Sequence, residues 1–268
     1  RSFSGITLTQ EKYVKSVLQK FRMLDAKPMN TPALDYSSER SKHPVKYPYR
    51  EAVGSLLHLS TKTRPDIANA VNLASRHLEE YVQEDVTALK RILRYLAGTC
   101  TKGIHFSSSG DLLTLKAFCD SDYAGDSETR KSTTGYVIIY GSGPISWCSR
   151  RQPIVTLSTT EAEYVAAADC CKAVSHLKSL IDEMTSSDIK VCLHVDNQSA
   201  INLIKTGVVN KRSKHIDVRY HYIHEKYSKG EIDVVYVPSE HQRADIFTKP
   251  LNKVKFDQHC DFIMKIVE

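Results

Sequence analysis

The chain has 268 residues, of which 41% are hydrophobic and 25% are charged, and its mean hydropathy is −0.35. No apolar run approaches the roughly 18 residues of a membrane span, so no membrane partner is expected. The seven cysteines include no C-x-x-C pair, which favours reduced thiols in an intracellular protein over a disulfide framework or a zinc site. Because there is no initiator Met and no signal peptide pattern, we expect a fragment of a longer protein.

The net charge of +6 is unevenly distributed. Residues 1–110 carry 17 Lys and Arg against 10 Asp and Glu, whereas residues 111–268 carry 20 against 21. A basic front piece suits a phosphate backbone, but ordinary surface charge would give the same excess. Lys90, Arg91 and Arg94 share a face of one predicted helix, either as solvated residues or as phosphate contacts.

Residues 1–100 are predicted to form a mainly helical domain. Pro65 suits the first turn of a helix, and Gly98 suits the C′ position after one. An irregular, polar connection is expected over 33–47, after two prolines. The apolar spacing predicts helices over 9–21, 49–62, 65–81 and 84–98.

Residues 101–251 are predicted to form an α/β domain, followed by a C-terminal tail over 252–268. A strand at 103–106 precedes a β-β-β-α-β-α-α-β-α order, which favours a five-stranded mixed sheet flanked by helices. The five strands are predicted around 112–119, 133–141, 144–157, 190–197 and 232–239, and the helices around 158–184, 198–207, 215–230 and 240–251.

Acidic residues stand at the ends of two predicted strands. Asp120 ends the first strand of the order, and Asp196 ends the strand that follows the long helix. Strands joined by a helix tend to lie parallel, so both carboxylates are expected at one edge of the sheet. Two converging carboxylates repel each other unless a cation neutralises them, and Mg²⁺ with oxygen ligands is the natural choice.

The long helix supplies a third acid. Ser158 and Glu161 fit the S-x-x-E capping box, which gives Glu161 a structural role. Glu163 lies one turn into the helix among apolar neighbours, so it needs either solvent or a cation. Asp245 is a fourth candidate, with an ordinary helix-surface position as the alternative. Asp122 and Asp126, in the polar loop after the first strand, are expected to be solvated turn residues.

Several stretches resemble a known family. "CDSDYAGD", "STTGYVI", "ISWCSRRQPIVTLSTTEAEYVA", "DNQSAI", "KHIDVRYHYI" and "RADIFTKPL" are similar to the ribonuclease H domain of copia-type LTR retrotransposon Pol polyproteins. "YREAVGSLLHLSTKTRPDIANAV" and "LKRILRYLAGT" resemble the end of the reverse transcriptase region, its thumb or connection. The resemblance implies a ribonuclease H-like fold preceded by a helical thumb or connection remnant.

The resemblance also implies a site and a reaction. By this resemblance, the four metal-binding carboxylates of the family fall on Asp120, Glu163, Asp196 and Asp245, with His241 and Ser158 as auxiliary residues. They would hold two Mg²⁺ ions, or Mn²⁺, and cleave the RNA strand of RNA–DNA hybrids. No Y-V-D-D polymerase motif occurs in this chain. The reverse transcriptase palm and the integrase of the polyprotein are the expected partners, in a cytoplasmic virus-like particle or the nucleus.

Substrate contacts are expected beside the acids. Asn197 and Gln198 are placed to reach 2′-hydroxyls, or alternatively to cap a helix. Trp147 with Arg150 and Arg151 is a further candidate patch, although Trp147 alone suits the core. The densest basic run of the back piece suits phosphate binding or a plain exposed loop, and consists of Lys211, Arg212, Lys214 and His215.

Three alternative interpretations stay open at this point. In the first, the chain is a catalytically inactive or domesticated nucleic-acid-binding fragment. In the second, it is another member of the same fold superfamily, such as an integrase or a 3′–5′ exonuclease. No H-H-C-C zinc module of the kind that often precedes integrase sites occurs in the sequence. The front helices alternatively serve only as a scaffold within a polyprotein, which is compatible with the enzyme interpretation.

Overall fold

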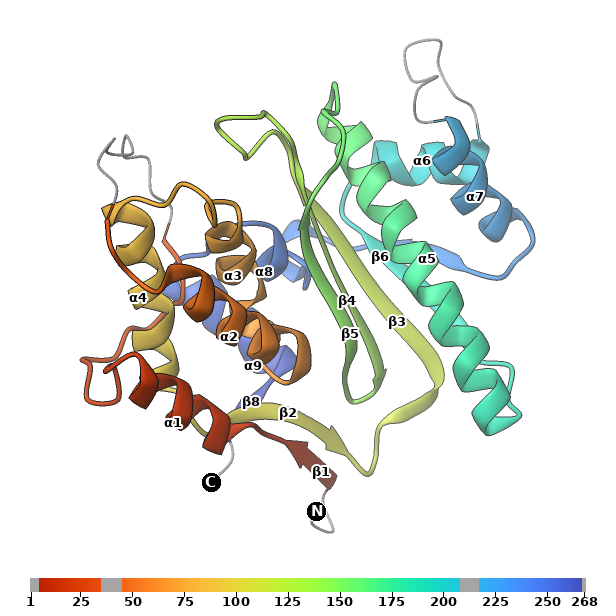
Figure 1. The fold of residues 1–268 in the computed structure, drawn as a ribbon. Coiled ribbons are helices and arrows are strands. Elements are labelled where there is room, and N and C mark those ends of the chain that lie inside the picture. Colours follow the sequence, from red (N-terminus) through yellow and green to blue (C-terminus); the bar gives the residue numbers. More distant parts are fainter. Residues whose placement is uncertain (1–4, 35–44, 208–216, 267–268) are drawn as a thin grey trace. The chain divides into compact units, whose positions relative to one another are not determined.

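The computed structural model describes residues 5–34, 45–207 and 217–266 (Figure 1). Contacts divide the chain into two compact units, one of residues 1–108 with 249–268 and one of residues 109–248. Among the described residues, no helix has both the length and the apolar composition needed to cross a membrane.

The first unit combines helices with a small antiparallel sheet in the order β1-β2-β8. Amphipathic spacing explains the helices, because residues such as Val14, Leu56 and Leu89 face a common core and are almost fully buried. Its elements are β1 (Gly5–Leu8), α1 (Glu11–Lys20), α2 (Tyr49–Lys62), η1 (Pro65–Ile67), α3 (Ala68–Ser75), α4 (Gln83–Ala97), β2 (Lys102–Ser107), α9 (Lys253–Ile263) and β8 (Lys265–Ile266).

Both ends of the predicted α/β domain, 101–108 and 249–251, belong to this first unit. The strand expected at 103–106 lies in β2, which pairs with β1 and β8 rather than with the five-stranded sheet. The residues expected as a tail, 252–268, contain the helix α9, in which Phe256 and Cys260 are buried. The Phe256 ring packs edge-on against Tyr95 with centroids 5.5 Å apart. Aromatic packing therefore fixes the C-terminal helix in the first unit.

A buried ion pair lies at the start of η1. Arg64 donates to both carboxylate oxygens of Asp66, at 3.0 and 2.8 Å, and also to the carbonyl of Thr99 at 2.9 Å. The Tyr95 hydroxyl donates to the same carboxylate at 2.7 Å. Burial alone would raise the pKa of Asp66, but the charge and hydrogen bonds of Arg64, together with Lys102 and Tyr95, outweigh it and the pKa is lowered. The bidentate geometry and the added donors compensate for desolvation of both charges.

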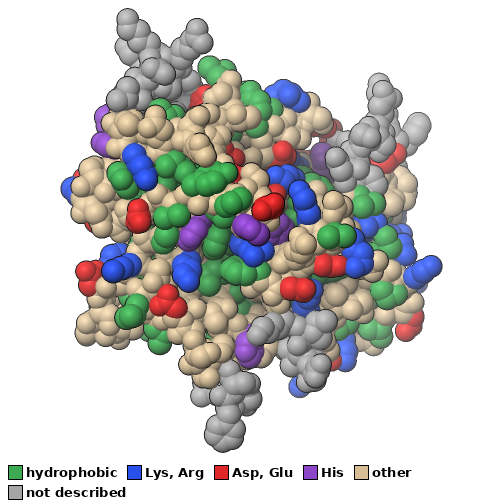
Figure 2. Space-filling view, turned by 180° about the vertical axis from the view of Figure 1, so that it is seen from behind, with side chains coloured by type: hydrophobic (Ala, Val, Ile, Leu, Met, Phe, Trp, Pro, Cys, Tyr) green, Lys and Arg blue, Asp and Glu red, His purple; other side chains and the backbone are tan. Residues whose placement is uncertain are grey.

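Two arginines on the basic face of α4 make hydrogen bonds within the first unit. Arg94 donates to the carbonyl of Lys27 at 2.7 Å, and Arg91 donates to the Thr31 hydroxyl at 2.9 Å. These contacts hold the segment that follows α1, so they give the two arginines a structural role. On the face shown in Figure 2, Lys and Arg side chains are interspersed with Asp and Glu rather than gathered into one patch.

Gly98 ends α4, as predicted, but not through a left-handed conformation. Its φ is −83°, which any residue can adopt. The constraint is steric, because a Cβ at this position would lie 2.8 Å from the Cβ of Pro28. The glycine therefore allows the segment after α1 to approach the end of α4 closely.

The second unit confirms the predicted ribonuclease H-like architecture. Its sheet has the strand order β5-β4-β3-β6-β7, with β3, β4 and β5 antiparallel and β3, β6 and β7 parallel. Its elements are β3 (Asp111–Asp122), β4 (Thr133–Gly141), β5 (Gly143–Arg151), α5 (Thr159–Thr185), β6 (Lys190–Val195), α6 (Gln198–Thr206), α7 (Asp217–Ser228), β7 (Asp233–Tyr236), η3 (Ser239–His241) and α8 (Asp245–Thr248).

The long helix α5 covers one face of this sheet (Figure 1). Alternate residues of β3, namely Leu115, Ala117 and Cys119, are fully buried against it. The helix presents Tyr164 and Val165 to the same core, both with no exposed surface. Burial of these apolar side chains, at roughly 25 cal/mol per Å², holds the helix on the sheet and sets the position of its first turns.

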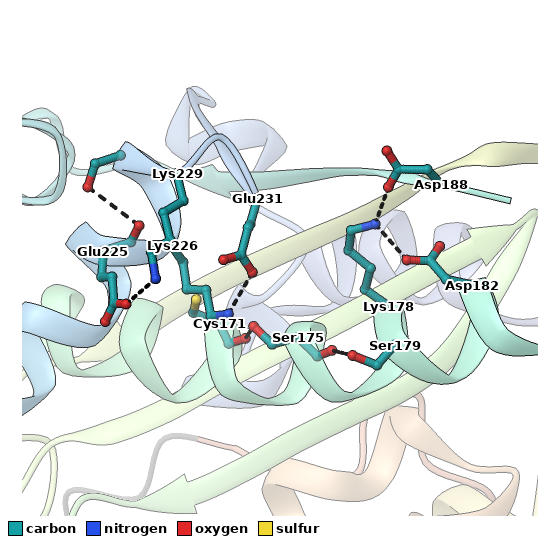
Figure 3. Close-up of polar contacts among 11 residues, drawn as sticks. Cys171, Ser175, Lys178, Ser179, Asp182, Asp188, Glu225, Lys226, Lys229 and Glu231 are labelled. Carbon is teal, nitrogen blue, oxygen red and sulfur yellow. Dashed lines mark hydrogen bonds and ion pairs between the residues drawn. The ribbon is translucent and has the colours of Figure 1, made fainter.

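Polar contacts tie the far end of α5 to the start of β6, as Figure 3 shows for Lys178. The Lys178 ammonium contacts Asp182 at 2.7 Å and Asp188 at 2.6 Å. Asp182 also accepts a hydrogen bond from the backbone N–H of Ile189 at 3.0 Å. The turn after α5 is thus fixed just before β6 pairs with β3, at Thr114 and Lys190.

The Arg64 ion pair yields a test of the first unit. We expect Arg64→Met to destabilise this unit by about 3–5 kcal/mol, because it leaves Asp66 charged and buried without its cation. Hydrogen exchange of the α4 amides measures the loss. Lys15→Met, which removes an exposed cation from a surface pair with Glu11, is the control and should leave exchange unchanged. Equal protection in the two variants would contradict this role.

Candidate active site

Parallel pairing of β3 and β6 brings two aspartates to one edge of the sheet. Phe118 and His194 are partners in the register, so Asp120 and Asp196 each follow two residues further along their strands. Asp120 is almost fully buried, whereas Asp196 is partly exposed just after β6. The predicted convergence of these two strand ends is therefore present in the structure.

Glu163 reaches the same place from the first turns of α5. One of its carboxylate oxygens accepts hydrogen bonds from the backbone N–H of Ser121 at 3.0 Å and from its hydroxyl at 2.9 Å. Ligand atoms of Asp120, Glu163 and Asp196 all lie within 4.8 Å of one another. The second oxygen of Glu163 is buried and has no hydrogen-bond partner among the described residues.

The charges in this group penalise one another. Burial and the neighbouring charges of Asp120 and Asp196 raise the pKa of Glu163 well above its ordinary value. A divalent cation would offset this repulsion and would give the second Glu163 oxygen a partner. Three carboxylates at this spacing are the hard oxygen donors that Mg²⁺ takes, so the residues present fit such an ion.

Asp245 approaches the same end of β3 without joining the group of three. It is the first residue of α8 and is only 5% exposed, which excludes the ordinary surface position considered from sequence. The Gln242 side chain donates to the carbonyl of Cys119 at 2.8 Å, and the Asp245 N–H donates to the carbonyl of Gln242 at 3.3 Å. The metal-ligand role of Asp245 therefore stays a prediction.

Two hydroxyls contact the grouped aspartates, and sequence analysis missed both. Thr248 donates to Asp120, and Ser239 donates to Asp196 at 2.8 Å. The available signal for Thr248 was its place in "RADIFTKPL", three residues after Asp245 and thus on the same helical turn. Ser239 carried no comparable signal.

The predicted N-cap of α5, Ser158, is confirmed, and Glu161 accepts from the residue before the cap. The Ser158 hydroxyl accepts from the N–H of Glu161 at 3.2 Å, and Glu161 accepts from the N–H of Leu157 at 2.8 Å. Glu161 is thus used to begin the helix, which leaves Glu163 as the acid of α5 that faces the aspartates. Ser158 likewise has a structural role as the N-cap.

The expectation that Asp126 is solvated is wrong. Asp126 is 7% exposed, and it accepts from the N–H of Thr129 at 2.9 Å and pairs with Arg151 at 2.9 Å. It is buried because it closes the loop between β3 and β4. Arg150 pairs with Asp169 at 2.8 Å, so both arginines of the suggested phosphate patch take part in ion pairs.

The expected substrate residues have different positions. Asn197 caps α6 by accepting from the N–H of Ala200 at 2.9 Å, whereas Gln198 is exposed on the first turn. His241 is exposed in η3, with its Nε2 atom 3.6 Å from the Glu240 carboxylate. The basic run lies outside the described residues, and it consists of Lys211, Arg212, Lys214 and His215.

Comparisons with known proteins agree with this description. No family model matches the chain. The chain is 40% identical over 267 residues to the retrovirus-related Pol polyprotein of transposon TNT 1-94 from Nicotiana tabacum, covering 96% of this chain and 20% of that protein. It is 39% identical to the corresponding polyprotein of transposon RE1 from Arabidopsis thaliana, covering 97% of this chain and 18% of that protein.

A shorter relative and a solved structure are also similar. An uncharacterized mitochondrial protein from Arabidopsis thaliana is 44% identical over 168 residues, covering 62% of this chain and 69% of that protein. A ribonuclease H1 isolated from compost has a TM-score of 0.39 and 19% identity, covering 55% of this chain and 97% of that chain.

The strand order and the acidic group define a protein with a ribonuclease H-like domain. The chain belongs to the family of retrovirus-related Pol polyproteins of copia-type transposons. It spans about a fifth of the length of the two polyproteins above, namely 20% of the first and 18% of the second.

The two glutamates of α5 provide a matched test of the site. Glu163→Gln keeps the acceptor for Ser121 but removes the buried charge, so we expect the metal-free second unit to melt a few degrees higher and to lose its stabilisation by Mg²⁺. The ordinary pKa of a glutamate is 4.5, and that of Glu163 is raised above it. Below pH 4.5 the carboxyl is protonated in both the folded and the unfolded chain, so Glu163→Gln should have little effect there. The stability gained by Glu163→Gln should appear as the pH rises above 4.5.

Thermal unfolding, followed by the fluorescence of Trp147, measures both effects. Glu161→Gln is the control, since this residue caps α5 and should leave stabilisation by Mg²⁺ intact. If instead Glu161→Gln abolished the Mg²⁺ effect while Glu163→Gln kept it, the assignment of the two glutamates would be reversed.

Proposed function

We propose that this chain hydrolyses the RNA strand of RNA–DNA hybrids endonucleolytically, as the ribonuclease H part of a retrotransposon Pol polyprotein. The observation that carries the proposal is the grouping of Asp120, Glu163 and Asp196 at one end of the sheet. Membership of the Pol family and the ribonuclease H-like strand order support the same reaction.

The carboxylates would hold two divalent cations, Mg²⁺ or Mn²⁺. We assign Asp120 as the shared ligand, Glu163 and Asp196 to one ion, and Asp245 to the other. Divalent cations held by these residues would supply an attacking water of lowered pKa and would stabilise charge on the leaving 3′ oxygen. Grouped acids that repel one another in the free protein are suited to this task, because cation binding relieves the repulsion.

The remaining residues of the site would orient ligands and substrate. Ser121 fixes the Glu163 carboxylate through two hydrogen bonds, so this ligand needs little reorganisation on binding. Gln198 is exposed beside Asp196, where its amide suits a 2′-hydroxyl, the group that distinguishes RNA from DNA. We retain Asn197, His241 and the basic run around Lys211 as further substrate contacts.

Partners and location are proposed on the basis of family membership. The reverse transcriptase palm and the integrase are the proposed partners, because the two long relatives are polyproteins that extend well beyond this chain. The first unit would then serve as the thumb or connection. A cytoplasmic virus-like particle or the nucleus is the proposed location.

A second candidate is a nucleic-acid-binding fragment without catalysis. The position of Asp245 favours it, because this acid is not part of the group whose ligand atoms lie within 4.8 Å. Such a fragment would bind hybrids but leave them intact.

Cleavage of a labelled RNA–DNA hybrid tests the proposal. The wild-type chain should cut the RNA strand in the presence of Mg²⁺ and stop when EDTA is added. Asp196→Asn should lower the rate by at least about 100-fold, because it removes a charged ligand of the metal. Glu225→Gln, which alters an exposed carboxylate on α7, should cut normally.

Hybrid binding is measured in parallel by fluorescence anisotropy. Retained binding with no Mg²⁺-dependent cleavage by the wild-type chain would support the inactive fragment and contradict the nuclease.

A further inference from the structure

Thr248 contacts Asp120 although 128 positions separate the two residues in sequence. Its hydroxyl donates to the Oδ2 atom of the carboxylate, and the two side chains are almost completely buried, at 2% and 3% exposure. A buried donor of this kind fixes the rotation of the carboxylate about its own axis.

Gly135 makes the contact possible. This residue of β4 lies directly opposite Asp120 in the antiparallel register. A Cβ at position 135 would lie 2.6 Å from Cγ2 of Thr248 and 2.9 Å from Cβ of Phe247. Only glycine at position 135 lets α8 pack this closely on the backbone of β4. This residue of β4 therefore determines whether the Thr248 hydroxyl reaches Asp120 on β3.

Gln242 also holds the segment that leads into α8. This residue is fully buried, and its amide donates to the carbonyl of Cys119, the residue before Asp120. The oxygen of the same amide accepts from the N–H of Ala244 at 3.2 Å. The segment leading into α8 is thus attached to the end of β3 next to the acid that Thr248 contacts.

We propose that Thr248 is a positioning residue that orients Asp120 for divalent cation binding, and that Gly135 is the position that admits it. The inference rests on the proposed function, because the cation is the one that the nuclease would use. Thr248 donates to Oδ2 of a carboxylate that has a ligand atom within 4.8 Å of those of Glu163 and Asp196. Outer-shell donors of this kind change metal affinity by about 10–100-fold.

A purely local role for the hydroxyl is the competing explanation. The same oxygen lies 3.1 Å from the carbonyl of Asp245, where it would simply close the short helix. A threonine hydroxyl has one proton and can donate to only one acceptor at a time. Loss of a local contact would affect stability, whereas loss of the Asp120 contact would affect cation affinity.

Mn²⁺ binding to the full chain without substrate separates the two roles. Electron paramagnetic resonance of free Mn²⁺ gives the dissociation constant, and thermal unfolding of the metal-free chain is recorded alongside. Thr248→Val keeps the shape of the side chain but has no hydroxyl, and should bind Mn²⁺ at least about 10-fold more weakly. Thr248→Ser restores the donor and should bind within about twofold of wild type.

A matched control removes a threonine hydroxyl elsewhere. Thr185→Val loses a hydrogen bond to the Ile181 carbonyl at the far end of α5 and should leave Mn²⁺ affinity unchanged. Gly135→Ala should weaken Mn²⁺ binding although it changes no polar group, since the added methyl displaces α8. If Thr248→Val does not fold, Thr248→Ala provides the smaller variant without a hydroxyl, with the same expected loss.

The outcomes separate the inference from the proposed function. Equal Mn²⁺ affinity in wild type and in the folded variants without the hydroxyl, together with hybrid cleavage by the wild type, would overturn the role of Thr248 alone. A wild-type chain that neither binds Mn²⁺ nor cleaves hybrids would overturn both. Weaker binding in Thr248→Ser as in Thr248→Val would show that shape rather than the hydroxyl matters, and would also overturn the inference.

Discussion

Parallel pairing of β3 with β6 is the constraint on which the site depends. It places Asp120 and Asp196 at the same register step beyond the Phe118–His194 pair. A shift of one residue would turn one carboxylate to the opposite face of the sheet. The burial of Leu115, Ala117 and Cys119 against α5 prevents such a shift, because the same alternation that fills the core decides where Asp120 emerges.

The same packing determines the position of the third acid, Glu163. Helix α5 begins at the N-cap Ser158, which fixes Glu163 five residues further along the chain, and its apolar residues lie on β3. The resulting acidic group is unfavourable in the free protein, as the raised pKa of Glu163 indicates. Hydroxyls of Ser121, Thr248 and Ser239 each contact one of the carboxylates and stabilise an arrangement that electrostatics alone would oppose.

Much of this arrangement was predictable, because it follows from local patterns. The S-x-x-E box distinguished Glu161 from Glu163, and two strands separated by a helix indicated that Asp120 and Asp196 would meet. Local sequence patterns do not predict contacts between segments that are distant in the chain. Asp126 looks like a loop residue in sequence, yet it is buried because Arg151, on another strand, pairs with it. The C-terminal helix α9 likewise packs on Tyr95, which local sequence cannot reveal.

Diffraction from crystals soaked in Mn²⁺ tests the central claim most directly, because anomalous scattering locates the ion without reference to activity. The account predicts an anomalous peak at about 2.0–2.2 Å, the distance range for small hard divalent cations, from oxygens of Asp120, Glu163 and Asp196. No peak at this edge of the sheet in a Mn²⁺-saturated crystal, or a peak coordinated by other residues, would contradict it.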